Sequence, residues 1–201
     1  DNVIKQDITL IMGGSKVADK IKLIDNLIKK ADKFLIGGAM CFTFLKAKGY
    51  NVGESYVETE SIEYAKRLLD ENGNKIVLPV DVVTKLGVRE VTSMDDDDIG
   101  YDIGSKTIAL FKDNLENAKL VLWNGPLGKY EEDDYDFGTR KILEYLKENK
   151  PEETVLAGGD VIAASNKCNI TFSHMSTGGG ATLEYLEGKE FKTLNKLNGT
   201  L

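Results

Sequence analysis

Apolar residues recur along the chain in short runs that are typical of buried β-strands. Six such runs, rich in β-branched and aliphatic side chains, stand at residues 7–12, 33–36, 75–80, 119–123, 154–157 and 169–172. After the first run, Val17, Ile21, Ile24 and Ile28 recur every three or four positions while polar residues take the other face, as in an amphipathic helix. Similar helical stripes occupy residues 40–48, 60–72, 105–117 and 136–149.

The alternation of predicted strands and helices decides the fold class. Continuous apolar strands separated by amphipathic helices indicate a parallel sheet with helices on both faces. We therefore predict an α/β fold, a three-layer, doubly wound (Rossmann-like) and mainly parallel sheet of about six strands. No proline-rich or serine-rich linker and no repeat interrupts the pattern, so we expect a single domain over residues 1–201.

Glycines gather where the predicted strands lead into helices. They stand at 13–14, 37–38, 125 with 128, 158–159 and 178–180. These positions lie at the carboxyl edge of a parallel sheet, where ligands bind in open α/β folds. One such turn alone indicates only a tight bend, whereas five along one edge favour a ligand site. Because bare backbone at a helix start presents free N–H groups and the positive end of the helix dipole, the pattern predicts a phosphorylated ligand.

Composition narrows the class of protein further. With 201 residues and 41% hydrophobic content, the chain can bury a core without disulfide or metal support. A net charge of -7 argues against a nucleic-acid partner, and no apolar run approaches the roughly 20 residues of a membrane helix. No signal-peptide pattern precedes the first strand. We interpret Cys41 and Cys168 as buried free thiols rather than a disulfide, which favours a cytoplasmic protein.

The stretch GGSKVADK at 13–20 matches neither common phosphate motif. It lacks the spacing of the P-loop, and no G-x-G-x-x-G follows the first strand, so P-loop enzymes and dinucleotide-dependent oxidoreductases are disfavoured. The stretch does place Lys16 and Lys20 four positions apart, which puts both on one face of the first helical turns. The two ammonium groups then reach one pocket, with a solvated lysine pair as the alternative.

Two further stretches carry candidate chemistry. AGGDVIAA, at 157–164, places Asp160 at the start of a small-residue helix, where an aspartate caps the helix or binds magnesium beside phosphates. WNGPLGKYEE, at 123–132, ends an apolar strand with an aromatic, an amide, a Gly-Pro pair and then acids. Taken alone, it indicates a turn with a buried Trp123.

Seven blocks of sequence, in a fixed order, are more specific than any one glycine motif. They are GGSKVADKI, IGGAMCFTFLKAKGYNVGES, LPVD, YDIGSKT, VLWNGPLGKYE, AGGDVIAA and SHMSTGGGATLEYLEGK. In this order they resemble the carboxyl-terminal, nucleotide-binding half of the phosphoglycerate kinase family, over nearly all of residues 7–190. Because the chain also opens on Asp1 rather than on a methionine, we expect a fragment that lacks the amino-terminal, phosphoglycerate-binding domain.

The resemblance implies a phosphotransferase reaction of glycolysis. These kinases pass the acyl phosphate of 1,3-bisphosphoglycerate to ADP, reversibly, giving 3-phosphoglycerate and ATP, by positioning and electrostatics without a covalent intermediate. The chain is then expected to bind Mg-ADP or Mg-ATP as a monomer. It is expected to have no nucleic-acid or membrane partner, and to be essentially inactive without the absent domain.

The resemblance also implies roles for individual residues at the phosphate end of the nucleotide. Lys16 and Lys20 would contact the nucleotide phosphates and the transferring group, and Asp160 would bind the magnesium ion. The remaining phosphate contacts would come from Asn124, Gly158, Gly159 and Val161, with Gly179 and Gly180 facing the transferring phosphoryl group.

At the other end of the nucleotide, Glu131 would hydrogen-bond the ribose. The adenine would lie in an apolar slot bounded by Gly14, Ser15, Gly38, Ala39, Gly100, Tyr101, Pro126 and Leu127. Ala39, Ser105 and Val161 depart from the family pattern of glycine, proline and threonine or serine, and residues 191–193 replace its Leu-Pro-Gly. Because Val161 offers no hydroxyl to a phosphate, weaker nucleotide binding is expected.

These departures keep a second function open, a catalytically silent nucleotide-binding or interaction module on the same fold. Other polar features are interpreted as structural. His174 is expected to be packed or hydrogen-bonded, because the family chemistry needs no general base. The acidic runs at 95–98 and 131–136 are expected to be solvated loops apart from Glu131.

Overall fold

Six parallel strands form the centre of the fold in the computed structural model, which describes residues 7–177. Their order across the sheet is β3-β2-β1-β7-β8-β9. The strands are β1 (Ile8–Met12), β2 (Lys33–Ile36), β3 (Ile76–Val77), β7 (Leu120–Asn124), β8 (Glu153–Ala157) and β9 (His174–Ser176). The order of the strands reverses between β1 and β7, because β2 and β3 lie on one side of β1 and β8 and β9 lie on the far side of β7. In folds of this kind, the carboxyl ends of the two strands at such a reversal form the usual ligand crevice.

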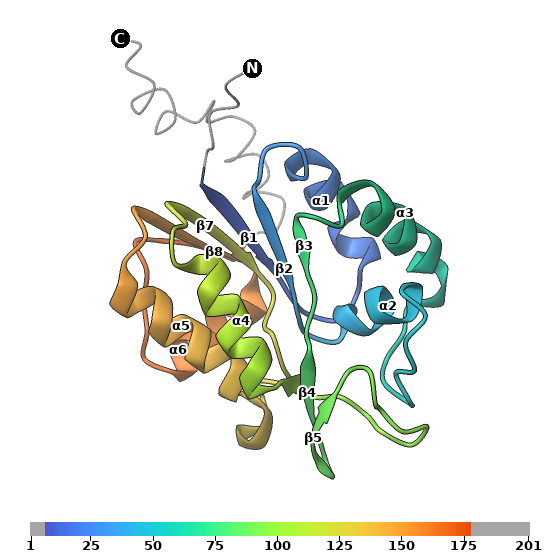
Figure 1. Ribbon diagram of the computed structural model, residues 1–201. Coiled ribbons are helices and arrows are strands. Elements are labelled where there is room, and N and C mark those ends of the chain that lie inside the picture. The colour runs from blue at the N-terminus through green and yellow to red at the C-terminus, as the bar shows by residue number, and fades with distance from the viewer. Residues whose placement is uncertain (1–6, 178–201) are drawn as a thin grey trace.

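Helices cover both faces of this sheet (Figure 1). One face carries α1 (Ile21–Leu27), α2 (Met40–Ala47) and α3 (Ile62–Asn72), with the short 3₁₀ turns η1 (Ala18–Lys20) and η2 (Thr59–Ser61) leading into α1 and α3. The other face carries α4 (Ser105–Leu115), α5 (Phe137–Asn149) and α6 (Gly159–Lys167), with η3 (Asp133–Tyr135) before α5. The predicted three-layer, doubly wound fold is confirmed.

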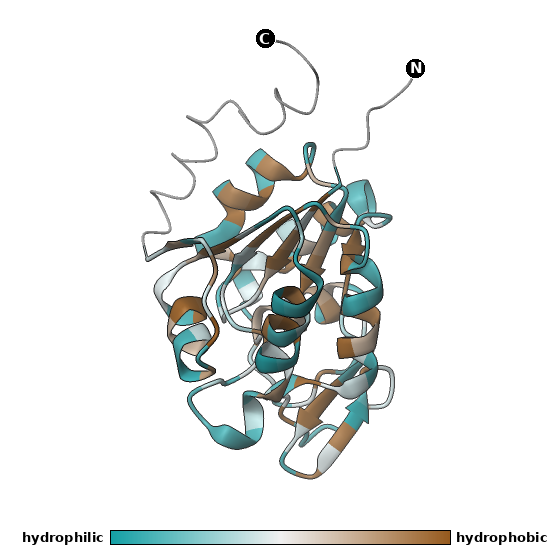
Figure 2. Cartoon of the chain, turned by 90° about the vertical axis from the view of Figure 1, so that its left-hand side faces the viewer, coloured by the Kyte–Doolittle hydropathy of each residue, from teal (hydrophilic) through white to brown (hydrophobic). Residues whose placement is uncertain are grey.

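The sheet separates the apolar core into two parts. In β1, Leu10 packs under α1–α3 whereas the next residue, Ile11, packs under α4–α6, and Phe34 and Leu35 of β2 divide in the same way. Successive side chains of a strand point to opposite faces, so a strand buried on both sides must be apolar throughout. Figure 2 shows the result, brown strands between helices that turn teal faces outward. No helix among residues 7–177 is both long and apolar enough to cross a membrane.

A small antiparallel sheet lies below the carboxyl edge of the main sheet and was not predicted. It consists of β4 (Asp81–Thr84), β5 (Gly87–Glu90) and β6 (Asp102–Ile103), in the order β5-β4-β6. Its strands are short and β5 is largely exposed, so the sequence shows no continuous apolar run there. This sheet supplies one wall of the site described below.

The last strand of the main sheet lies later in the chain than predicted. Residues 169–172 were expected to form it, whereas the observed strand is β9. Asn169 adopts a left-handed φ of 56°, and the N–H of Ile170 donates to Ser165 O at 3.0 Å. These residues end α6 rather than start a strand, because a left-handed residue closes the open carbonyls of a helix end.

Candidate functional site

The turns after β1 and β7 are bonded to each other at the carboxyl edge of the sheet. The N–H of Gly13 donates to Asn124 O and the N–H of Gly14 to Pro126 O, both at 2.8 Å. A Cβ on Gly13 would lie only 2.1 Å from Pro126 O. Glycine is therefore required at position 13 because two backbones approach more closely than a side chain allows.

The turn after β2 joins the same group. The N–H of Gly37 donates to Met12 O at 2.8 Å, and that of Gly38 to Leu127 O at 3.0 Å. A Cβ on Gly38 would lie 2.5 Å from the backbone N of Gly14. The expectation of free N–H groups is therefore wrong for the glycines after β1 and β2, because neighbouring carbonyls accept from Gly13, Gly14, Gly37 and Gly38.

The turn after β8 is open. Gly158 has a φ of 105° and donates to Ser176 O at 2.8 Å, whereas a Cβ on Gly159 would meet nothing within 4 Å. Gly159 and Asp160 are exposed, and within residues 7–177 no group accepts from their N–H groups. The first turn of a helix leaves such donors unpaired, and the dipole favours an anion there. The structure thus leaves free donors at this helix end, and the phosphate site stays a prediction.

A half-buried lysine faces this helix end. Lys20, the last residue of η1, donates from Nζ to Asn124 Oδ1 and lies against Gly14. Burial lowers the pKa of Lys20, while the carboxylates of Asp19 and Asp160 raise it. Asp160 therefore lies within electrostatic reach of the ammonium group. A cation and a carboxylate are held beside free backbone donors.

The predicted relation between Lys16 and Lys20 is wrong in its geometry. The first helical turn begins only at Ala18, as a 3₁₀ turn, so Lys16 precedes it and the two lysines do not share a helical face. Ser15 and Lys16 are both exposed, in the loop that follows Gly14. The role predicted for Lys16 stays a prediction.

Part of the predicted boundary of the adenine slot lines one small cavity. Its volume is about 10 Å³, and its walls include five predicted residues: Gly38, Ala39, Gly100, Tyr101 and Leu127. Gly14 and Pro126 are bonded to each other beside it, and Ser15 lies outside in the exposed loop. The Phe42 ring packs so closely on Gly100 that a Cβ there would be 2.1 Å from Phe42 Cζ. The cavity is too small for a purine ring, so the adenine slot stays a prediction.

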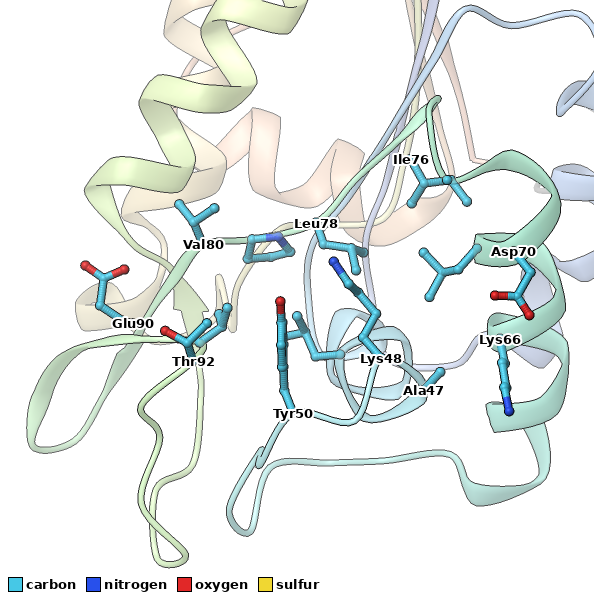
Figure 3. A pocket seen from close by; sticks show the side chains of 15 residues that line it. Ala47, Lys48, Tyr50, Lys66, Asp70, Ile76, Leu78, Val80, Glu90 and Thr92 are labelled. Carbon is cyan, nitrogen blue, oxygen red and sulfur yellow. The ribbon is translucent and has the colours of Figure 1, made fainter.

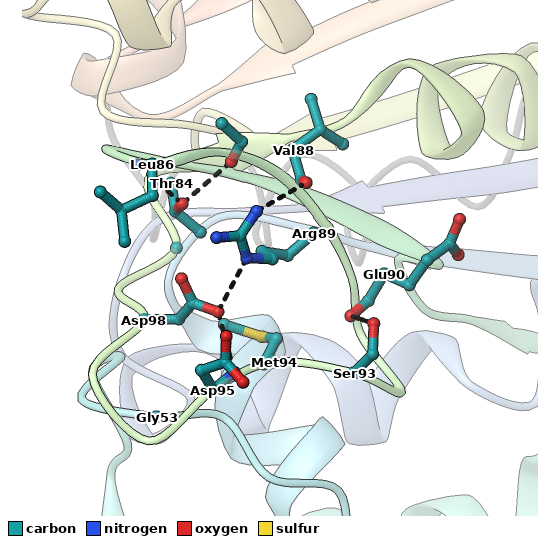
Figure 4. A network of polar contacts seen from close by, with 12 residues as sticks. Gly53, Thr84, Leu86, Val88, Arg89, Glu90, Ser93, Met94, Asp95 and Asp98 are labelled. Atoms are coloured by element: carbon teal, nitrogen blue, oxygen red, sulfur yellow. Dashed lines mark hydrogen bonds and ion pairs between the residues drawn. The ribbon is translucent and has the colours of Figure 1, made fainter.

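The wall at Gly100 is supported by an ion pair that was not predicted. Arg89 Nε lies 3.3 Å from Asp98 Oδ2, which also accepts from the N–H of Asp95 at 2.9 Å (Figure 4). Asp98 is buried, so the expectation of a solvated loop over 95–98 is wrong at this residue. The N–H of Gly100 donates to Ser55 Oγ at 3.0 Å. These contacts fix the backbone that borders the slot.

The acidic run at 131–136 is also more ordered by contacts than expected. Glu131 is exposed, whereas Tyr135, expected in a solvated loop, is buried, and its ring stacks on Tyr101 with centroids 4.6 Å apart. The N–H of Lys129 donates to Tyr101 O at 2.8 Å. Glu131, the predicted ribose ligand, is thus carried by a segment that is attached to the slot.

Asp102 was missed by the sequence analysis, although it supports this segment. Its carboxylate is buried and accepts from the N–H of Ile103 at 2.8 Å and of Gly138 at 2.7 Å. Burial raises the pKa of Asp102 to about 7, against the lowering effect of these two donors, with Asp136 raising and Arg140 lowering it further. An isolated aspartate in a β-rich stretch carries no sequence signal of such burial.

Val161 does not present its side chain to the helix end. The side chain is buried in the core beneath α4–α6. A valine here therefore adds to packing, and only its backbone N–H is available to a ligand. Trp123 is likewise buried, and its Nε1 donates to Gly125 O at 2.7 Å, as the structural interpretation predicts.

The histidine and the two cysteines lie in the following surroundings. His174 is half-exposed, with Nε2 3.4 Å from Glu153 Oε1, so the expected polar partner is present. Cys41 is buried and burial raises the pKa of its thiol, whereas Cys168 is only half-buried; both are free. Gly179 and Gly180, which were predicted to face the transferring phosphoryl group, lie outside the described residues.

A larger cavity, of about 650 Å³, lies away from the predicted site. It opens between α2, α3, the exit of β3 and the end of β5, and contains none of the predicted residues. Figure 3 shows Lys48 and Tyr50 pointing into it and Lys66 pointing away. Among the described residues, no group of three or more His, Cys, Asp or Glu side chains forms a metal centre.

The fold and the site define an α/β protein whose ligand crevice lies at the carboxyl edge of a parallel sheet. The comparisons with known proteins identify which family this is. The phosphoglycerate kinase family profile matches residues 2–189, so the chain belongs to the phosphoglycerate kinase family.

Named relatives agree with this assignment. The chain is 49% identical over 189 residues to phosphoglycerate kinase of Lactobacillus delbrueckii subsp. bulgaricus, which covers 90% of this chain and 47% of that protein. The identity to phosphoglycerate kinase of Enterococcus faecalis is 46%, over 96% of this chain and 51% of that protein. The structure of phosphoglycerate kinase from Coxiella burnetii superposes with a TM-score of 0.86 at 34% identity, over 92% of this chain and 51% of the other. The chain spans about half the length of these relatives.

Proposed function

We propose that this chain is the nucleotide-binding half of a phosphoglycerate kinase, a single domain that binds Mg-ADP or Mg-ATP at the carboxyl edge of its sheet. In this proposal the phosphates lie at the start of α6, near Lys20 and Asn124, and the adenine lies toward the slot. Glu131 contacts the ribose between them.

One observation carries the proposal. Lys20, Asn124, Gly158, Gly159 and Asp160 come from three different turns and meet at a helix end with free N–H groups. A Cβ on Gly158 would lie 3.4 Å from Asn124 Nδ2, so the β7 and β8 turns are in direct contact. Backbone donors, an ammonium group and a dipole are the means by which proteins stabilise transferring phosphoryl groups.

Asp160 fits the ligand set of magnesium. Beside nucleotide phosphates, magnesium takes one or two carboxylates, with phosphate oxygens and water as the other ligands. Asp160 is exposed at the open helix end and needs no second carboxylate for this purpose. When bound, the ion supplies positive charge to the phosphate oxygens and orients the phosphate chain.

The complete reaction, transfer of the acyl phosphate of 1,3-bisphosphoglycerate to ADP, belongs to the proposal for the whole enzyme. We propose that this chain alone binds nucleotide but is essentially inactive, as a monomer of the cytoplasm. Its span of about half the length of its relatives supports the inactivity of the chain alone. Near-normal turnover by the chain alone in a coupled assay would contradict it.

The test is a calorimetric titration of the chain with ADP, with and without magnesium. We expect binding that strengthens when magnesium is added, and Asp160→Asn is expected to lose about tenfold or more in affinity, mainly through the magnesium-dependent part. Asp113→Asn is the matched control, because Asp113 is exposed on α4 beside a cavity at the opposite, amino edge. We expect this control to bind as the unmodified chain does.

The titration also separates nucleotide binding from the interaction module that the sequence leaves open. An unmodified chain that binds no ADP under either condition would contradict nucleotide binding and favour an interaction module. Equal losses in the two variants would show that Asp160 has no special role, even if the chain binds ADP.

A further inference from the structure

The segment that carries Glu131 is attached to the slot wall on one side. It runs between β7 and α5. The N–H of Lys129 donates to Tyr101 O at 2.8 Å, and the N–H of Gly138 donates to Asp102 Oδ2 at 2.7 Å. These bonds fix the two ends of the segment, whereas Glu131 lies between them on the surface.

Lys167 attaches the middle of the same segment to α6. Its Nζ donates to Tyr130 O at 2.8 Å and lies 2.7 Å from Asp133 Oδ1 and 3.3 Å from Asp136 Oδ2. An ammonium group has three N–H donors, and here three acceptors of one segment surround it. The acceptors lie on both sides of Glu131 in the sequence. The lysine is therefore placed to set the path of the backbone at Glu131.

The charge of the segment explains why a cation is needed. Residues 131–136 contain five carboxylates, which repel one another along a short stretch. The hydrogen bond to Asp133 has the largest effect and raises the pKa of Lys167, burial lowers it by less, and the hydrogen bond to Asp136 raises it again, so the lysine is charged at neutral pH. Its charge offsets this repulsion where the segment bends.

The helix that ends in Lys167 begins at the proposed phosphate site. Gly159 and Asp160 form its first turn, and Lys167 is its last residue. Burial, and then the carboxylates of Glu131 and Asp160, raise the pKa of Tyr130. Asp160 is thus within electrostatic reach of the segment. One helix connects the residues proposed for phosphate and magnesium with those proposed for the ribose.

We propose that Lys167 is a positioning residue for ribose recognition, which holds the 130–136 segment so that the carboxylate of Glu131 meets the ribose hydroxyls of a bound nucleotide. This inference rests on the proposed function, in which Glu131 is the ribose ligand. Lys167 acts through the segment and does not touch the nucleotide. Without it, Glu131 samples more positions and binding must order the segment, which weakens the ribose contact.

Two simpler effects of Lys167 must be distinguished from positioning. A partly exposed ion pair often contributes little, in which case its removal changes nothing. A lysine near the site also attracts the anionic phosphates directly, in which case its removal weakens every nucleotide alike. Only positioning of Glu131 makes the effect depend on the ribose hydroxyls.

The experiment compares Mg-ADP with Mg-2′,3′-dideoxy-ADP, which lacks both hydroxyls, by titration of the 201-residue chain. We expect the unmodified chain to prefer ADP by about tenfold, as for hydrogen bonds to a carboxylate. Lys167→Met should reduce this preference to about threefold or less, while the affinity for dideoxy-ADP changes by less than about twofold. Lys167→Arg, which keeps the charge and donors, should retain most of the preference.

Lys147→Met is the matched control. Lys147 is an exposed lysine of α5 that donates to Thr171 O at 2.9 Å and makes no contact with the 130–136 segment. Lys147→Met removes the same charge as Lys167→Met does, together with one hydrogen bond to a backbone oxygen. We expect it to leave the preference for ADP unchanged.

Glu131→Gln links the inference to its premise. In the unmodified background it should abolish most of the preference, and adding Lys167→Met should then cause little further loss, because both act on one contact. If Lys167→Met keeps the preference, or weakens both nucleotides equally, the positioning role is wrong. If Glu131→Gln itself keeps the preference while ADP still binds, the ribose contact of the proposed function fails instead.

Discussion

The turns after β1, β2 and β7 differ from the turn after β8 in what surrounds their glycines. In the first three, named here the interlocked turns, the N–H groups of Gly13, Gly14 and Gly38 donate to carbonyls of neighbouring turns. In the β8 turn, named here the open turn, Gly159 faces open space. The interlocked turns form a fixed wall, and the open turn leaves backbone donors for a ligand.

This difference shows that one sequence feature serves two physical purposes. A glycine in an interlocked turn is needed because backbone atoms occupy the place of its Cβ. A glycine in the open turn has room for a side chain. The lack of a side chain there matters only when a ligand approaches the backbone. Alanine at an interlocked turn should therefore reduce stability, whereas alanine at the open turn should weaken ligand binding and leave stability nearly unchanged.

The largest expected effect is on stability, at an interlocked turn. Gly13→Ala should reduce the free energy of unfolding by about 3–5 kcal/mol, because its Cβ would stand 2.1 Å from Pro126 O and the backbone cannot yield without separating two turns. Urea denaturation measures this loss, and a loss large enough to prevent folding appears as insoluble protein. Gly13 has no left-handed φ, so its loss comes from the clash alone, and Gly49→Ala, with a φ of 87° and an unobstructed Cβ, gives the smaller cost of backbone strain without a clash.

The control is expected to lose only about 1–2 kcal/mol, the cost of a left-handed alanine. A Gly13→Ala variant as stable as the unmodified chain would show that the interlocked turns are not tightly held. In that case the comparison between the two kinds of turn would have no structural basis.

The next effect concerns the segment held by Asp102 beside the interlocked turns. The pKa of the Asp102 carboxyl is raised from an ordinary 3.8 to about 7, chiefly by burial. Between these values the folded protein binds a proton that the unfolded chain has lost. The contribution of Asp102 to stability therefore falls as pH rises from about 4 to about 7, and is constant above that.

Asp102→Asn removes this titration. We expect the free energy of unfolding of the unmodified chain, relative to the variant, to fall by about 2–4 kcal/mol from pH 4 to pH 8, measured by urea denaturation. Asp81→Asn is the control, because Asp81 is another buried aspartate, whose carboxylate accepts from the N–H of Thr107 at 2.7 Å. Parallel pH profiles for the unmodified chain and Asp102→Asn would contradict the buried proton.

The sequence predicts features that follow from local periodicity and fails where contacts are distant. Apolar runs located five of the six strands of the main sheet, and the glycines located its carboxyl edge. The β9 strand was misplaced because Asn169 ends α6 by a left-handed turn that apolar content does not reveal. The burial of Asp98 and Asp102 was missed because it involves contacts with other parts of the chain. Asp98 pairs with Arg89, which belongs to no recognisable motif, and Asp102 accepts from Gly138, which lies far away in the sequence.

The candidate site shows the same limit. The resemblance to a known family placed Asn124, Glu131 and Asp160 at one edge, and the structure brings Asn124 and Asp160 together around Lys20. The i to i+4 argument for Lys16 failed because a 3₁₀ turn begins after it. Helical spacing applies only once a helix has started, and its first residue is the least predictable one.

The smallest expected effect on stability is at the open turn, where binding should change instead. Gly159→Ala should alter the free energy of unfolding by less than about 1 kcal/mol, since its Cβ meets nothing within 4 Å and alanine is a good helix former. The same variant should bind Mg-ADP about tenfold more weakly, because a methyl group prevents close approach of a phosphate to the backbone. Denaturation and titration of one preparation measure both quantities. A variant that lost stability as Gly13→Ala does, or that kept full affinity, would mean that the turn is not open to a phosphate, and the two kinds of turn would then differ only in packing.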